Sequence, residues 1–154
     1  GDGEITFCGA IEMAGYADVK FDVIDNGMEK HGVDHPIFEP GHRGPTFEDY
    51  VTFCGYSVTE DGEQKYIDSH TAYRRASLQA IDYLKQFGYT GEQAYHILGT
   101  VPVEGRQSGV VDIPNACSTL ALPKGAFEFD ISPDGLDANS ADRGNVVVTD
   151  DPLS

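Results

Sequence analysis

Positive charge is scarce in this 154-residue chain, and the scarcity argues against several classes of partner. Ten lysines and arginines stand against 26 aspartates and glutamates, which gives a formal net charge of −16 at pH 7. So acidic a protein repels phosphate backbones and anionic lipid surfaces. We therefore expect neither a nucleic-acid-binding protein nor a membrane-surface protein.

Long apolar runs and paired cysteines are also lacking. No stretch approaches the ~18 apolar residues of a membrane-spanning helix, so a soluble protein is expected. The three cysteines, Cys8, Cys54 and Cys117, are widely spaced and form no C-x-x-C pair. This pattern fits reduced thiols in a cytoplasmic protein better than a disulfide or zinc framework.

Length and composition indicate one globular domain followed by a polar segment. The chain has the length of a single domain, and 40% of its residues are hydrophobic. From about Ser132 onward the sequence becomes polar and poor in large apolar residues. We therefore predict a domain over residues 1–131 and a polar C-terminal tail over residues 132–154.

Period-two alternation predicts strands in the first half of the chain. Val19, Phe21 and Val23 alternate with polar residues, which predicts two strands within residues 5–24. The stretch 50–59 is rich in β-branched and aromatic residues and is followed by a turn signal, so residues 50–67 are expected to form a hairpin. Residues 25–48 show no consistent period and are expected to form a long ordered loop.

Helical periodicity begins near His70. Apolar residues recur at helical spacing from there to Phe87, which predicts a helix capped by Asp68 or Ser69. Thr90 and Gln93 have the spacing of a capping box, which predicts a second, short helix ending at Gly99.

Two short strands are expected after the helix pair, on either side of Pro114 and Asn115. The switch from period 2 to period 3.6 and back predicts an α+β chain. Its sheet is expected to be largely antiparallel, with a helix-turn-helix pair beside it.

Three carboxylates near the start of the chain are candidates for chemistry. Asp2 and Glu4 alternate with glycines, and a compact oxygen-rich site of this kind suits a divalent metal or a general acid/base pair. Glu12 is flanked by apolar residues, which would raise its proton affinity and suit proton transfer. An acidic turn in solvent and a solvent-facing strand residue are the alternatives.

Other reactive residue types have weaker patterns. His31, His35 and His42 gather with Asp34 and Glu39 in the irregular loop, which fits either a metal site or a surface or interface loop; we prefer the surface or interface loop.

Two further candidates lie later in the chain. Arg106 lies within a short glycine-flanked stretch and is a candidate for holding a carboxylate or carbonyl oxygen. Cys54 and Cys117 have no local nucleophile signature and are interpreted as ordinary apolar cysteines.

Long strings over residues 1–130 resemble one enzyme family. GDGEITFCGAIEM, FEPGHRGP and the stretch from IDSHTAYRRASLQAIDYLKQFGYTGEQAYHILG to PNACSTLALP resemble, in order, the acetamidase/formamidase family and most closely its formamidase branch. The resemblance implies a larger, β-rich fold of which this is the C-terminal part. In that family a string G-D-x-H-x-x-Q-G-D-G-E crosses the acid-rich site, so the present chain is expected to start inside a site motif.

The resemblance also implies an activity. It implies hydrolysis of a small aliphatic amide, formamide first, by a cytoplasmic homo-oligomer. Asp2 and Glu4 are the implied ligands of a divalent metal such as zinc, Glu4 and Glu12 the catalytic carboxylates, and Arg106 the substrate-binding residue. The upstream part of the polypeptide is then a required partner, and the isolated chain is expected to be inactive.

Two alternatives stay open beside this reading. One is a non-catalytic β-rich binding or oligomer-assembly module. The other is a cysteine amidase of the nitrilase type, which needs a Glu/Lys/Cys set whose local sequence contexts are not found.

Overall fold

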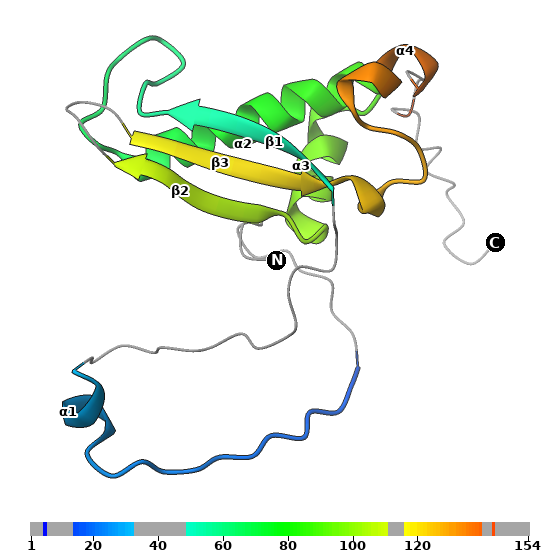
Figure 1. Cartoon of the computed structure of the whole chain (residues 1–154). Helices are drawn as coiled ribbons and strands as arrows, with labels where there is room; N and C mark the ends of the chain where they lie inside the picture. Colours follow the sequence, from blue (N-terminus) through cyan, green and yellow to red (C-terminus); the bar gives the residue numbers. More distant parts are fainter. Residues whose placement is uncertain (1–4, 6–13, 33–48, 111–115, 140–142, 144–154) are drawn as a thin grey trace. The chain divides into compact units, whose positions relative to one another are not determined.

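The computed structural model describes residues 5, 14–32, 49–110, 116–139 and 143. The chain forms two units, one made of residues 1–11 and 47–154 and the other of residues 12–46. Figure 1 draws the elements of both. The first unit contains the sheet and the long helices, and it is described first.

The described sheet has three antiparallel strands in the order β1-β3-β2. Their bounds are Tyr50–Tyr56 for β1, Glu104–Val110 for β2 and Ala116–Pro123 for β3. A register shift between Gln107 and Gly109 marks a bulge in β2. The predicted antiparallel α+β class is therefore confirmed.

Helix α2, Ser69–Gln86, lies across one face of this sheet (Figure 1). It starts where the sequence predicts, because the Asp68 side chain accepts hydrogen bonds from the backbone N–H groups of His70 and Thr71 and so caps two orphan donors. The face toward the sheet is formed by small and apolar residues that are all buried: Ala72, Ala76, Ser77, Ala80 and Leu84.

Helix α3, Gly91–Thr100, packs against α2. Gly88 has φ +90°, a left-handed conformation that glycine adopts easily and that turns the chain between the helices. The predicted capping box is present, because Thr90 Oγ1 accepts from the N–H of Gln93 and the Gln93 side chain accepts from the N–H of Thr90. Among the described residues, no helix combines the length and apolar character needed to cross a membrane.

The core lies between α2, α3 and the inner face of the sheet. Its largest fully buried side chains come from elements far apart in the sequence. They include Phe87, Leu84, Leu98, Leu120, Leu122, Val103 and Ile131. The ring of Tyr83 packs edge-on against Phe53 and Phe87, and its hydroxyl donates to the Ile131 carbonyl at 2.7 Å.

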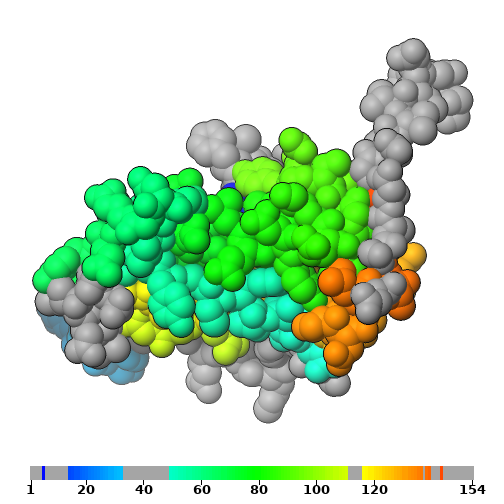
Figure 2. Space-filling view, turned by 90° about the horizontal axis from the view of Figure 1, so that it is seen from above, coloured from blue at the N-terminus to red at the C-terminus, as the bar shows by residue number. Residues whose placement is uncertain are grey.

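The residues after β3 return to the end of the helix pair. They form short helical turns, η1 (Lys124–Ala126), η2 (Pro133–Gly135) and α4 (Leu136–Asn139), seen in orange at one end of Figure 2. The Arg143 guanidinium lies 4.2 Å from the centre of the Phe129 ring and donates to the carbonyls of Phe87 and Asn139. Part of the segment expected to be a tail thus contacts the core, and the domain boundary at residue 131 stays a prediction.

The strands predicted within residues 5–24 are wrong for the described residues 14–24, which form no strand. Val19, Phe21 and Val23 are 58%, 87% and 91% exposed. An alternating apolar pattern forms a strand only where a neighbouring strand can pair with it and an apolar surface can cover it. Among the described residues, none provides such a partner or surface for residues 14–24. The second unit contains instead the short helix α1, Gly27–His31, which is followed by Gly32 at φ +66°.

The hairpin predicted across residues 50–67 is confirmed only close to its turn. Val58 and Gln64 form an antiparallel bridge, and the backbone N–H groups of Thr59 and Lys65 donate to the carbonyls of Glu63 and Ser57, but no longer return strand follows. Ile67 has φ +50°, which is rare for a β-branched residue and breaks the extended conformation just before α2. The long-range strand β3 pairs with β1 instead.

Gly55 sets how closely α2 approaches β1. A Cβ atom at this position would lie 2.0 Å from the Ala72 carbonyl oxygen and 2.4 Å from the Ala76 nitrogen. Both obstacles are backbone atoms, so no side-chain rotation relieves the overlap. On the facing helix, Ala72 and Ala76 are small and fully buried, so α2 can lie close to β1.

Gly55→Ala is therefore expected to lower the free energy of unfolding by about 1–3 kcal/mol or more, because α2 must shift on the sheet. Gly109→Ala is the matched control, since nothing lies within 4 Å of its added Cβ. Urea denaturation of both variants tests the prediction. Equal stability of the two would show that α2 and β1 separate without cost.

A second prediction concerns pH. Hydrogen bonds from the Thr71 hydroxyl and from the backbone hold the pKa of Asp68 below its usual range. Its ionised form therefore stabilises the fold above about pH 3.9, the unfolded value, and this contribution is lost as pH falls through the lower folded pKa.

Asp68→Asn keeps an acceptor but removes the charge. We expect the difference in unfolding free energy between the wild type and this variant to be constant near neutral pH and to shrink as the solution is acidified. Urea denaturation at neutral pH and at about pH 3 measures it. A difference that does not change with pH would show that the charge of Asp68 has no part in capping α2.

Candidate functional site

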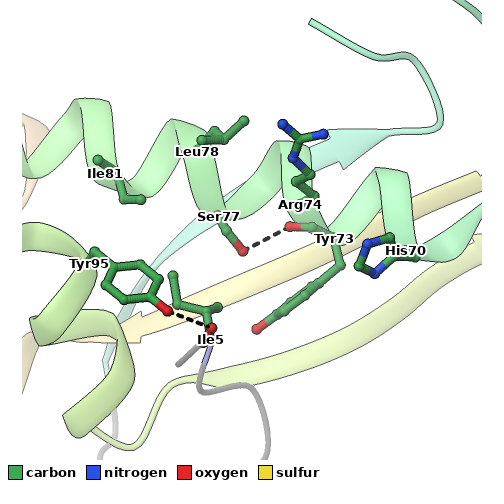
Figure 3. A pocket seen from close by; sticks show the side chains of 8 residues that line it. All are labelled: Ile5, His70, Tyr73, Arg74, Ser77, Leu78, Ile81 and Tyr95. Carbon is green, nitrogen blue, oxygen red and sulfur yellow. Dashed lines mark hydrogen bonds between the residues drawn. The ribbon is translucent and has the colours of Figure 1, made fainter. Parts of the chain in front are cut away.

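A hollow of about 360 Å³ runs along α2 beside α3 (Figure 3). Its walls are mostly apolar, and the hydroxyls of Ser77 and Tyr95 are each hydrogen-bonded to a main-chain carbonyl. The residues around it are Ile5, His70, Tyr73, Arg74, Ser77, Leu78, Ile81 and Tyr95.

Ile5 brings the start of the chain into this hollow. Its side chain is partly buried against the core, and its carbonyl accepts a hydrogen bond of 3.5 Å from the Tyr95 hydroxyl (Figure 3). In sequence Ile5 directly follows Glu4, one of the predicted acidic positions. The α2–α3 pair thus holds the residue next to the predicted acidic motif.

A second hollow, of about 340 Å³, lies between the N-terminal turn of α2 and the edge strand β2. It shares His70 and Tyr73 with the first. The Tyr73 ring lies against Gly105, where an added Cβ would meet ring atoms at 3.1–3.2 Å. The remaining residues of this hollow are Ser69, Arg106, Gln107 and Ser118.

Arg106, the predicted substrate-binding residue, borders the second hollow. Because Gly105 faces Tyr73, the alternation of a strand directs the Arg106 side chain to the opposite face of the sheet. There its Nη2 atom pairs with Glu104 Oε2 at 3.0 Å, and 71% of the side chain is exposed. A guanidinium carries five N–H donors, so one carboxylate partner leaves donors for a further oxygen.

Glu104 connects Arg106 to Tyr50 of strand β1. Its other oxygen accepts a hydrogen bond of 3.2 Å from the Tyr50 hydroxyl. Partial burial, together with the negative charge of Glu104, raises the pKa of Tyr50. The tyrosine therefore stays a neutral donor, and the carboxylate joins β1 to the arginine on β2.

The predicted acidic and metal-binding positions are mostly outside the described residues. Asp2, Glu4 and Glu12 lie there, so their roles stay predictions. His35 and His42 lie there as well, whereas His31 is exposed on α1. In the part of the chain that the structure describes, no group of three or more His, Cys, Asp or Glu residues could hold a metal ion.

Sequence analysis did not identify His70, Tyr73 and Tyr95 as residues of one site. The i, i+3 spacing of His70 and Tyr73 along a predicted helix places them on one face, and this spacing was the sequence pattern that could have linked them. Tyr73 is half-buried. The sequence does not indicate that β2 and α3 close around these two residues, because those contacts are long-range.

The family model "Acetamidase/Formamidase family" matches residues 1–129 of the chain. The chain belongs to this family. The antiparallel sheet and helix pair described above are therefore a portion of that family's fold.

Individual relatives agree with this membership. A formamidase from Methylophilus methylotrophus is 62% identical over 133 residues, which are 86% of this chain and 33% of that protein. An acetamidase from Mycolicibacterium smegmatis is 55% identical over 107 residues, which are 68% of this chain and 26% of that protein. The chain thus spans between about a quarter and a third of the length of these family members.

A solved structure supports the fold. The gamma lactamase from Delftia acidovorans is 56% identical in sequence and superposes with a TM-score of 0.68, covering 71% of this chain and 27% of that chain. The sheet and helix pair are accordingly a portion of a larger fold.

The exposure of Arg106 yields a prediction about stability. Arg106→Gln is expected to change the free energy of unfolding by less than about 1 kcal/mol, because exposed ion pairs contribute little. Arg143→Gln is the matched control and should lower the free energy of unfolding by about 1.5–3 kcal/mol. Its guanidinium donates hydrogen bonds to main-chain carbonyls and lies over the Phe129 ring. Thermal and urea denaturation measure both, and a large loss for Arg106→Gln would assign that residue to the framework of the fold.

Proposed function

We propose that the polypeptide carrying this sequence hydrolyses the carbon–nitrogen bond of a small aliphatic amide, and that its substrate is formamide, which yields formate and ammonia. One observation carries the proposal: the 62% identity with a formamidase over 133 residues, which are 86% of the chain. The acetamidase relative supports the class of reaction, the cleavage of small linear amides.

Hydrolysis requires a water molecule to attack the amide carbon while negative charge develops on the carbonyl oxygen. In the proposal, Glu4 and Glu12 move the protons, one from the attacking water and one to the departing nitrogen. Arg106 binds the substrate oxygen with donors that Glu104 leaves available. Its exposure on the face of the edge strand β2 is compatible with that role.

A divalent metal such as zinc is part of the proposal. Asp2 and Glu4 offer the carboxylate oxygens that would hold it, and it would act as a Lewis acid on the amide carbonyl. Metal analysis of the purified polypeptide, before and after Asp2→Asn, tests this assignment by metal content alone. Unchanged metal content would remove Asp2 from the ligand set.

The proposed activity belongs to a longer polypeptide. Because the chain spans only about a third of the formamidase relative, the remaining two thirds supply the partners of the acidic positions. We propose that this polypeptide acts in the cytoplasm as a homo-oligomer. The exposed face of the sheet, where Tyr56 is 58% exposed, would then be available for contacts with the rest of the assembly.

The exposed face also favours the second candidate, a non-catalytic assembly module. In that case the same sheet surface would bind a neighbouring subunit and the acidic positions would have no chemical role. Ammonia release from formamide separates the two candidates.

The experiment compares the 154-residue chain with the full-length polypeptide. The chain alone should release negligible ammonia, and the full-length polypeptide should release it readily. In the latter, Glu4→Gln and Glu12→Gln should each lower kcat by about 10²–10⁴-fold, the usual contribution of a proton-transferring residue. Glu63→Gln is the matched control, because Glu63 lies exposed in a loop beside Lys65 and should leave kcat unchanged.

Two results would contradict parts of the proposal. Full activity of the Glu4→Gln and Glu12→Gln variants would remove these carboxylates from the mechanism. No ammonia release by the full-length polypeptide from formamide or acetamide would leave the assembly module as the function.

A further inference from the structure

Two cysteines from distant parts of the sequence meet on the open face of the sheet. In the β1–β3 register, Cys54 lies opposite Thr119 and Cys117 lies opposite Tyr56, so the two cysteines are diagonal neighbours on adjacent strands. Both alternate with buried residues that face α2, which directs the two thiols to the other face.

The two thiols face each other and are accessible. Burial, together with the neighbouring Cys54 thiol, raises the pKa of the Cys117 thiol. Cys54 is exposed and Cys117 is half-buried, and both are free. In the 154-residue chain a reagent can therefore reach the pair from the side of the sheet opposite α2.

The diagonal arrangement disfavours a direct disulfide and favours a bridge through one intervening atom. Diagonal cross-strand neighbours have Cα atoms about 7–8 Å apart, whereas disulfides rarely exceed about 6.8 Å. A direct bond would therefore require the strands to shift. One soft atom placed between the sulfurs spans a wider gap, since metal–sulfur bonds are about 2.3 Å each, against about 2.05 Å for a single S–S bond.

We propose that Cys54 and Cys117 form a dithiol site that captures a thiophilic centre through both sulfurs, and that trivalent organoarsenicals are the ligand class. An arsenical of this class needs only two sulfur ligands, which is what the pair offers. With an arsine oxide, two As–S bonds form, and the oxygen leaves as water with the two thiol protons. Arsenic stays trivalent, so no oxidant or reductant is required.

Capture at this site would join β1 to β3. The first As–S bond holds the second thiol nearby, so closing the ring is intramolecular and strengthens binding by about 10²–10⁴-fold over a single thiol. The site uses none of the residues proposed for amide hydrolysis, so the two proposals fail independently.

The test uses phenylarsine oxide with the 154-residue chain and with the full-length polypeptide. Intact-mass measurement should show one phenylarsine group per chain, and thiol titration should show two thiols lost. A dithiol such as dimercaptopropanol should remove the group, whereas a monothiol such as glutathione should not. Cys54→Ser and Cys117→Ser should each weaken binding by about 100-fold or more.

Cys8→Ser is the matched control and should leave binding unchanged. Far-UV circular dichroism confirms that each variant is folded, and Cys54→Ser, at an exposed position, provides the decisive comparison if Cys117→Ser unfolds. Binding that survives Cys54→Ser, or that is lost in folded Cys8→Ser, would overturn the proposed site.

Discussion

The close approach of α2 to β1 at Gly55 is the constraint on which the rest of the unit depends. A residue with a side chain at this point would collide with the backbone of the helix, and Ala72 and Ala76 keep the opposite surface equally small. Because the helix lies directly on the strand here, Phe53, Leu84, Leu120 and Leu122 can meet in one core. The three-stranded sheet then has one apolar face covered and one face open.

The position of α2 also determines the candidate site. Its N-terminal turn, anchored by Asp68, carries His70 and Tyr73 between two hollows, one beside α3 and one beside β2. Ile5 enters the first hollow and Arg106 borders the second. Helix α2 thus lies beside both Ile5, which follows the predicted carboxylate Glu4 in sequence, and strand β2, whose Arg106 directs its side chain to the opposite face of the sheet.

The open face of the sheet has a chemistry of its own. Glu104 joins Tyr50 to Arg106 across the strands, and the two free thiols of β1 and β3 lie on the same face. These groups come from β1, β2 and β3, and β1 is separated from the other two by the whole helix pair in the sequence. The face that α2 leaves uncovered therefore carries the groups suited to binding, whereas the covered face carries those suited to packing.

Local signals in the sequence determined the elements that depend on neighbouring residues. The Asp68 cap, the Thr90–Gln93 capping box and the helical spacing of Ala76, Ala80 and Leu84 act within one or two turns, so the helix pair was predictable. Arg106 could likewise be singled out from its residue type and context.

Long-range pairing decided the rest. Residues 14–24 alternate like a strand and form none, because a strand needs a partner that periodicity does not specify; β1 pairs with β3 across about 60 residues instead of with its own sequence neighbour. The strand register makes Cys54 and Cys117 diagonal neighbours, and the close packing of α2 on β1 at Gly55 places His70 and strand β2 on either side of one hollow. Neither is encoded in a local pattern, since only tertiary packing brings these residues together.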